Sequence, residues 1–265
     1  MIKLPAYDPE APIIVVDIGN TTTKVATWEG GHLKTVLSSE TGDLNAFKEV
    51  FNAHWDAAPK KRPAAIVVGS VVPEALTQIR DCVGELLETE PLIVGDTVPL
   101  PMDVAVTDAK AIGVDRVCEA AAAYDRLNTG CTVVSFGTAV TIDLVDDDGT
   151  LLGGAILPGI ALQMRALHEF TAALPAGTPG FPELPFGRNT IEAIQVGVCR
   201  GLAGAVREIV ESYAAHLNRW PQIVATGGGA AFMMPYCDFI DTWAADLTLR
   251  GIALAYEKHL HAMGA

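Results

Sequence analysis

A carboxylate, a glycine and a run of hydroxyl residues lie together in the stretch Asp17-Ile18-Gly19-Asn20-Thr21-Thr22-Thr23-Lys24. A carboxylate at the end of a strand can hold a hydrated Mg²⁺ ion, which in turn bridges phosphate oxygens. Gly19 lets the backbone approach a ligand closely, and the hydroxyl and amide groups that follow can bind phosphate. The same residue types also form ordinary hairpin turns, so this stretch alone leaves both interpretations open.

A second stretch, residues 133–143, repeats the pattern of residues 15–25 at a constant offset along the chain. In both copies an apolar run is followed by a glycine and then by small hydroxyl residues, among them Thr138 in the second copy. The copies differ at the residue that ends the first strand, which is Asp17 in one and Ser135 in the other. Two such hairpins, one opening each half of the chain, would form a phosphate clamp across an interdomain cleft.

A third glycine turn, Gly227-Gly228-Gly229, follows the predicted strand 222–226. Backbone without side chains offers a surface against which a flat nucleoside could lie. A flexible turn is the alternative for these glycines.

An acidic side chain, Asp115, stands next to a guanidinium, Arg116, in the stretch Gly113-Val114-Asp115-Arg116 at the start of a predicted helix. A kinase that phosphorylates a small alcohol needs a carboxylate to accept the hydroxyl proton and a cation near the transferred phosphoryl group. This tetrapeptide could provide both groups. An isolated Asp at a helix N-terminus is more often only a helix-start residue.

The elements around these motifs alternate between strands and helices, as apolar periodicity and turn residues indicate. Each half begins with a strand, a glycine turn and a second strand, which indicates a duplicated α/β architecture with its boundary in a helix near residues 115–130. Residues 95–112 and 174–188 are predicted to be irregular, and long exposed loops often carry function. The predicted strands are 12–17, 24–28, 64–69, 92–94, 131–145 (with a turn at Gly137) and 222–226, and the predicted helices are 76–87, 114–127, 160–172, 189–217 and 247–261.

Composition limits the classes of function that remain. Half of the 265 residues are hydrophobic, which suffices for one large core or two modest ones. The net charge of −14 argues against nonspecific nucleic-acid binding, although backbone amides can still hold a nucleotide. The five cysteines form no C-x-x-C pair, so we expect reduced thiols and no metal site. We expect a cytoplasmic protein, because the chain has neither a signal-peptide pattern nor an apolar run of about 18 residues.

Taken together and in order, the motifs closely resemble type III pantothenate kinase. That family belongs to the superfamily of sugar and acetate kinases, actin and the heat-shock chaperones. The resemblance implies two duplicated ribonuclease-H-like (actin-like ATPase) domains with a nucleotide cleft between them, here residues 1–118 and 119–265. The motifs that carry it are residues 17–24, 70–73, 113–116, 137–143, 153–159, 171–175, 189–190 and 247–251.

The resemblance also implies an activity and its parts. It implies ATP-dependent phosphorylation of pantothenate, the first step toward coenzyme A, by a homodimer with Mg²⁺ and a substrate pocket near the subunit interface. Asp115 would accept the hydroxyl proton. The residues implied to bind ATP are Asp17, Gly19, Asn20, Thr21, Thr22, Lys24, Thr138, Gly227 and Gly228, with Asp17 also holding Mg²⁺; those implied to bind pantothenate are Gly113, Val114, Asp115, Arg116 and Thr190.

Two positions depart from the family. The family usually has Asp where this chain has Ser135, and that Asp ligates a monovalent cation, K⁺ or NH₄⁺. The family also usually has a substrate-contacting Tyr near residues 106–107, which are Val-Thr here. Three hypotheses remain: a pantothenate kinase with an altered cation requirement, a kinase of another small alcohol, or a non-catalytic relative that binds nucleotide or a pantothenate-like ligand. Asp17 and Asp115 argue against the third, because a binding protein needs no catalytic base.

Overall fold

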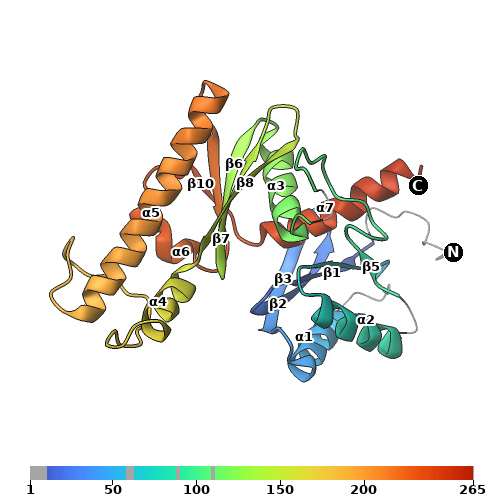
Figure 1. The fold of residues 1–265 in the computed structure, drawn as a ribbon. Coiled ribbons are helices and arrows are strands. Elements are labelled where there is room, and N and C mark those ends of the chain that lie inside the picture. Colours follow the sequence, from blue (N-terminus) through green and yellow to red (C-terminus); the bar gives the residue numbers. More distant parts are fainter. Residues whose placement is uncertain (1–10, 58–62, 88–89, 109–110, 265) are drawn as a thin grey trace. The chain divides into compact units, whose positions relative to one another are not determined.

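A computed structural model describes residues 11–57, 63–87, 90–108 and 111–264, and the chain forms two compact α/β units (Figure 1). The first unit comprises Met1–Asp125 together with Leu247–Ala265, and the second comprises Arg126–Asp246. Each unit is built on its own five-stranded sheet.

The compact units differ from the division expected at residues 118/119. The first unit extends to Asp125 because most of α3 (Val114–Leu127) packs there, so the boundary falls later in the same helix. The last helix, α7 (Leu247–Ala262), also belongs to the first unit because it packs on β1 and β4. The expected division into two continuous segments did not allow the C-terminal segment to return to the first unit.

The first sheet has the strand order β3-β2-β1-β4-β5. β2 pairs antiparallel with β1 and β3, whereas β4 pairs parallel with β1 and β5. Its strands are β1 (Ile13–Ile18), β2 (Thr22–Glu29), β3 (His32–Glu40), β4 (Ile66–Ser70) and β5 (Leu92–Ile93), and the remaining helices of this unit are α1 (Leu44–Ala57) and α2 (Pro73–Leu87).

The central strand β1 is buried on both faces, as its apolar sequence predicts. Ile14 and Val16 pack in the cluster that contains Phe51 of α1. Val15 points the other way and packs in the cluster that contains Ile252 of α7. Helices therefore cover both faces of this sheet (Figure 1).

The second sheet repeats this topology, with the strand order β10-β9-β6-β7-β8. β6 pairs antiparallel with β7 and parallel with β9, as β1 does with β2 and β4. The duplicated α/β architecture expected from the sequence is therefore confirmed. The elements of this unit are β6 (Cys131–Phe136), β7 (Ala139–Val145), β8 (Leu151–Pro158), α4 (Ile160–Glu169), α5 (Thr190–Leu217), β9 (Gln222–Thr226), α6 (Ala230–Met233), a 3₁₀ turn (Met234–Tyr236) and β10 (Thr242–Trp243).

The expected helix 189–217 is confirmed as α5, and its start is capped as its sequence predicts. The side chain of Asn189 accepts a hydrogen bond from the amide of Glu192, at 3.0 Å. The Glu192 carboxylate in turn accepts one from the amide of Arg188, at 2.8 Å. Two donors at the helix start are thus satisfied by side chains.

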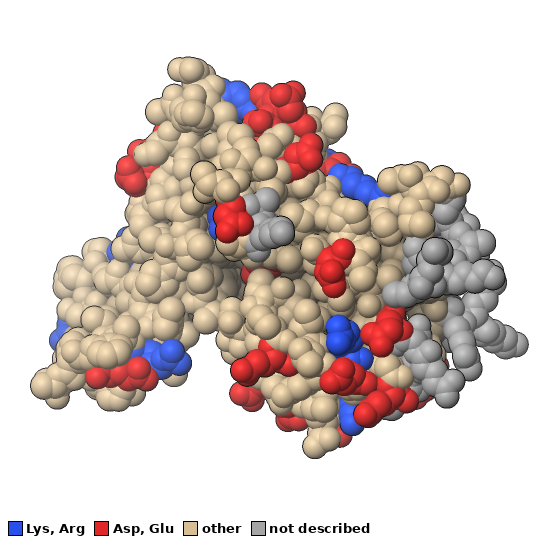
Figure 2. Space-filling view, turned by 45° about the vertical axis from the view of Figure 1, so that its right-hand side comes forward, with Lys and Arg blue, Asp and Glu red and all other residues tan. Residues whose placement is uncertain are grey.

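The surface and the thiols agree with the composition. Acidic side chains are spread over the face shown in Figure 2, with few basic ones beside them, as the net charge of −14 requires. All five cysteines are buried free thiols. Within the described ranges, every helix is too short or too polar to cross a bilayer.

Two glycines, Gly251 in the contact between α7 and α3 and Gly204 on the surface of α5, test how closely the helices pack. A Cβ at Gly251 would overlap the backbone carbonyl of Cys118, whereas a Cβ at Gly204 of α5 would meet nothing. We expect Gly204→Ala to stabilise the protein by about 0.5–1 kcal/mol through helix propensity. Gly251→Ala should instead destabilise it by about 1–3 kcal/mol or more, because the overlap pushes the helices apart. Thermal unfolding of the two variants measures both effects, and equal shifts would contradict the packing.

Candidate active site

Strand alternation places Asp17 on the α7 side of the first sheet. Side chains two residues apart share a face, so Asp17 points to the same side as Val15. Asp17 lies opposite Lys24 on β2 and Gly69 on β4. A Cβ at Gly69 would come within 2.7 Å of the Ile252 side chain, so glycine there lets α7 approach the sheet closely beside Asp17.

Asp115 occupies the first turn of α3. Its Oδ1 accepts a hydrogen bond from the Arg116 amide at 2.8 Å, and a Cβ at Gly113 would overlap this carboxylate. Burial raises the pKa of Asp115, while that amide bond and the Arg116 charge lower the pKa by a smaller amount. A carboxylate with a raised pKa is a stronger proton acceptor than an ordinary Asp.

The charges of the two candidate carboxylates both act on one buried thiol, Cys118. Burial raises the pKa of Cys118 well above its ordinary value, and the charges of Asp17, Asp115 and Glu119 raise that pKa further. Asp17 and Asp115 come from separate motifs, and the fold of the first unit brings both near Cys118. The sequence gives no signal for this proximity, because it depends on how α3 docks. The thiol itself stays protonated and is not a nucleophile.

A second contact ties α3 to α7 beside this thiol. The hydroxyl of Thr248 on α7 donates to the carboxylate of Glu119 at 3.0 Å, and Glu119 is buried. Thr248 lies within the motif 247–251 and Glu119 lies outside the motifs, and the sequence predicted no role for either side chain. Their bond lies one helical turn from Asp115, so it helps to fix the helix that carries the candidate base.

The turn that follows Asp17 is exposed at its tip. Asn20, Thr21 and Thr22 are exposed, whereas Thr23 is buried. The Gly19 amide donates to the Thr22 carbonyl at 3.1 Å, which closes the turn. The predicted phosphate-binding residues of this motif therefore stand together at one end of the first sheet.

The second glycine turn is enclosed by glycines from two other segments. Thr138 is exposed at the tip of the β6–β7 hairpin, and its carbonyl accepts from the Gly159 amide at 2.9 Å. The Gly229 amide donates to the Phe136 carbonyl at 2.8 Å. Gly227 has a positive φ of 93°, and a Cβ there would collide with Phe136. The fold thus gathers Thr138 and the turn 227–229, including exposed Gly228, around the end of β6.

Ser135 lies beside hydroxyl residues on both neighbouring strands, and the buried carboxylate of Asp143 shares their face. The register partners of Ser135 are Thr141 on β7 and Thr226 on β9, so the three side chains share one face of the sheet. The Thr141 hydroxyl oxygen is buried without a hydrogen-bond partner among the described residues. Within the described ranges, no three His, Cys, Asp or Glu side chains cluster as metal ligands.

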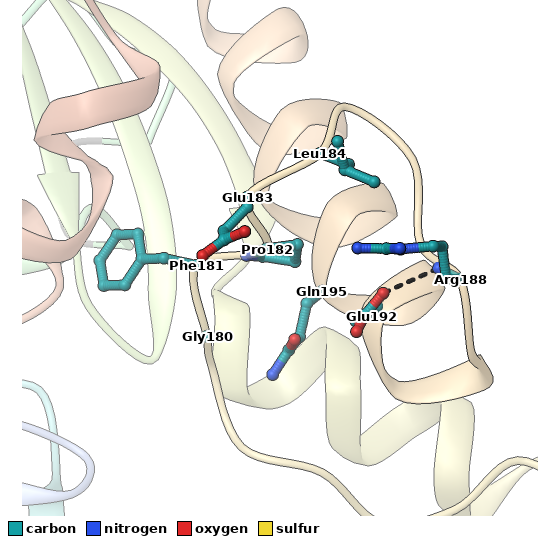
Figure 3. A pocket seen from close by; sticks show the side chains of 8 residues that line it. All are labelled: Gly180, Phe181, Pro182, Glu183, Leu184, Arg188, Glu192 and Gln195. Carbon is teal, nitrogen blue, oxygen red and sulfur yellow. Dashed lines mark hydrogen bonds between the residues drawn. The ribbon is translucent and has the colours of Figure 1, made fainter.

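Thr190 lies in the second unit, as the exposed first residue of α5. A cavity of about 360 Å³ is formed by α5 and the preceding loop, and Thr190 is not among the residues that line it (Figure 3). Figure 3 shows the side chains of Arg188, Glu192 and Gln195 along the helix side of this cavity. Gly113–Arg116 belong to the first unit, so the fold of neither unit alone brings them to Thr190.

The segment 95–112 is irregular where it is described, as expected, and residues 109–110 lie outside the described ranges. Thr107 is exposed and Val106 is half-buried within it. Neither side chain can supply the aromatic ring that the family usually places there.

Solved structures with the same fold define the class of protein. A structure described as a Baf family transcriptional activator from Campylobacter jejuni matches with a TM-score of 0.58 and 20% identity, over 92% of this chain and 98% of that one. A ROK family glucokinase from Streptomyces griseus, solved with glucose and AMPPNP, matches with a TM-score of 0.52 and 12% identity, over the same shares. The fold is that of the actin-like ATPase superfamily, with its duplicated ribonuclease-H-like domains.

Sequence comparison then identifies the family. The type III pantothenate kinase family model matches residues 13–212. A type III pantothenate kinase from Ruegeria pomeroyi is 34% identical over 254 residues, which cover 93% of this chain and 97% of the relative. The chain belongs to the type III pantothenate kinase family, and the resemblance seen in its motifs is confirmed. It is a kinase, a phosphotransferase with an alcohol acceptor.

Proposed function

We propose that this chain transfers the γ-phosphoryl group of ATP to pantothenate, with Asp115 as the acceptor of the hydroxyl proton. The observation that carries the proposal is that α3 starts beside the strand pair that holds Asp17: a Cβ at Gly69, the register partner of Asp17, would lie 3.6 Å from the side chain of Val114, the neighbour of Asp115. Phosphoryl transfer depends on positioning and on charge. The carboxylate that holds the phosphate-bound metal ion must therefore stand near the carboxylate that accepts the proton of the attacking hydroxyl. Burial, which raises the pKa of Asp115, suits the latter role.

ATP binding is assigned to one turn of the first unit and two turns of the second. Gly19, Asn20, Thr21, Thr22 and Lys24 of the first turn, and Thr138, Gly227 and Gly228 of the second unit, would contact the nucleotide. Asp17 would hold Mg²⁺, which neutralises charge on the phosphates when bound. A single carboxylate beside exposed hydroxyl groups fits this ion, because Mg²⁺ keeps several waters and is usually bound through one or two carboxylates and phosphate oxygens.

The alcohol is assigned to the start of α3. Gly113, Val114 and Arg116 would line its site, and the Arg116 guanidinium would stabilise charge on the transferred group. Asp115 takes the proton as the hydroxyl oxygen bonds to phosphorus, and ADP leaves with the electrons of the broken P–O bond. Thr190 would contact the substrate as well. The buried free thiols support placement in the cytoplasm, where thiols stay reduced.

A shifted substrate is the second candidate function. The observation that favours it is Val106 and Thr107 in place of an aromatic ring. Turnover of small alcohols other than pantothenate, measured side by side with pantothenate, separates the two. Stabilisation by nucleotide without turnover of any alcohol would indicate a non-catalytic relative.

We also propose that the protein acts as a homodimer through the second unit. Large apolar side chains are exposed there at Ile156, Phe170, Phe181 and Phe186, with Phe170 84% exposed. Covering these side chains in a dimer would remove apolar surface from water, which favours association. Sedimentation equilibrium should give a dimer that Phe170→Glu weakens, whereas a wild-type monomer at micromolar concentration would contradict the proposal.

Substitution of the two carboxylates, Asp115 and Asp17, should affect turnover and nucleotide binding differently. Asp115→Asn should lower kcat by on the order of 10²–10⁴ with Mg²⁺-ATP affinity kept, because only proton acceptance is lost. Asp17→Ala should lose Mg²⁺-ATP affinity and turnover together. Calorimetric nucleotide titration and steady-state kinetics measure both, with Asp81→Asn on the exposed side of α2 as the matched control.

Stability and pH provide the internal checks on Asp115. Since its folded-state pKa is raised, ionised Asp115 costs stability above that pKa, and Asp115→Asn should not lower Tm at pH 7. Wild-type kcat/KM should fall on the acid side with an apparent pKa above the ordinary 3.8. Near-normal turnover in Asp115→Asn would remove this residue from the mechanism.

Ser135 should make turnover nearly indifferent to the monovalent cation. Serine offers a neutral oxygen, and an ion held by neutral oxygens alone competes poorly with its own hydration. Replacing K⁺ by a bulky organic cation at constant ionic strength should therefore change the rate little. Ser135→Asp should be slower without K⁺ and partly recover with it, because the unpaired carboxylate repels phosphate.

Ser135→Asn is the matched control for that experiment, since it adds similar bulk without charge. Its rate should not depend on K⁺. Strong K⁺ activation of the wild type would contradict the account and would mean that other oxygens complete a cation site.

A further inference from the structure

Thr41 holds the turn between β1 and β2 although it lies outside every motif described above. It directly follows β3, and its hydroxyl donates to the Gly19 carbonyl at 2.8 Å. Its amide donates to the Thr21 carbonyl at 3.0 Å. Its hydroxyl oxygen also lies 3.0 Å from that of Thr23. One residue thus contacts three positions of the turn.

Which hydroxyl group donates in each hydrogen bond follows from the single proton that each hydroxyl group carries. A hydroxyl group has one proton to donate, and Thr41 gives its proton to the Gly19 carbonyl. Thr23 must therefore be the donor in the bond between the two hydroxyls. Thr23 is only 1% exposed, so the Thr23 end of this relay is buried, whereas Thr41 and Gly19 are half-buried.

The relay belongs to a wider pattern in which protein donors hold the carbonyl oxygens of the turn. A carbonyl oxygen repels phosphate and an N–H group attracts it, so a phosphate-binding turn works only if its carbonyls point into the protein. The carbonyls of Ile18, Gly19, Thr21 and Thr22 accept hydrogen bonds from the Val71 amide, the Thr41 hydroxyl, the Thr41 amide and the Gly19 amide respectively.

Local structure fixes Thr41 itself. Gly42 has a positive φ of 97°, which lets the chain leave β3 and turn at once into α1. Asp43 then caps that helix, and its carboxylate accepts from the Ala46 amide at 3.0 Å. The orientation of Thr41 is therefore set by the start of α1, which packs against the first sheet.

We propose that Thr41 is a positioning residue for nucleotide binding. It keeps two carbonyls of the turn directed into the protein, so that the exposed tip presents amide and hydroxyl groups to the ATP phosphates. This role rests on the proposed binding of nucleotide by the turn residues Gly19, Asn20, Thr21 and Thr22. Thr41 touches neither ATP nor the transferred group, and acts only through the backbone of Gly19 and Thr21.

The test compares two isosteric substitutions in the same relay. Thr41→Val removes the donor to the Gly19 carbonyl, whereas Thr23→Val removes a neighbouring hydroxyl and leaves that donor in place. Calorimetric titration with Mg²⁺-AMPPNP should show about tenfold weaker binding for Thr41→Val and near-wild-type binding for Thr23→Val. Thr41→Ser should restore binding, because serine keeps the hydroxyl.

Kinetics and amide exchange separate positioning from a loss of stability. Thr41→Val should raise KM for ATP while KM for pantothenate stays unchanged, and it should speed hydrogen exchange at residues 19–22. Wild-type affinity in Thr41→Val, or an equal loss in Thr23→Val, would overturn the inference. If Thr41→Val does not fold, Thr41→Ala takes its place in the same comparison. A wild-type protein that does not bind Mg²⁺-AMPPNP would overturn the proposed function instead, and this role with it.

Discussion

The close approach of α7 to α3 is the contact on which the candidate site depends. Gly251 lies against the backbone of Cys118, and Ile252 fills the space above Gly69. These two contacts set the depth at which α3 sits over the first sheet, and Asp115 stands in the first turn of that helix. A shift of the helix would move the candidate base relative to Asp17, and a misplacement of about 1 Å can cost a large factor in rate.

The same contact explains why the last segment of the chain returns to the first unit. β1 alternates, so the side that carries Val15 and Asp17 needs an apolar cover, and α7 supplies it through Leu249 and Ile252. A carboxylate at the end of this face borders a closely packed helix pair. Asp115 stands at the start of one helix of this pair, and its burial there raises its pKa. The packing of the core thus also produces a carboxylate suited to general-base chemistry.

Sequence patterns predicted the elements that carry strong signals and missed those defined by their surroundings. The apolar runs of β1 and β6, the glycine turns and α5 with its Asn189 cap are local features, and each was predicted. β3 was not, because an edge strand with one exposed face carries few apolar residues. α1 was missed as well, although Phe47, Phe51 and His54 have helical spacing.

Within the site, the motif residues were predictable and their supports were not. Asp115 and the residues around Asp17 stand in recognisable stretches. Thr41 and Thr248 act through hydrogen bonds to residues far away in the chain, and although Thr248 stands in the motif 247–251, the sequence around neither residue predicts its partner. Such contacts become visible only when the register of β2 with β3 and the docking of α7 are known.

The two hairpins also differ in a way that the constant sequence offset conceals. In the first, Asp17 lies opposite Lys24, whereas in the second Ser135 lies opposite Thr141, one step earlier in the repeat. The first turn is therefore one residue longer, and a pair of opposite charges in one hairpin corresponds to a pair of neutral hydroxyls in the other. Opposite charges facing each other across a strand pair stabilise it, and so do paired hydroxyl residues. The second hairpin instead carries a buried carboxylate two residues further along β7, at Asp143, which shares the face of Ser135 and Thr141. In the proposed nucleotide site, the contribution of this hairpin to binding the phosphates would rest on backbone amides and the exposed Thr138.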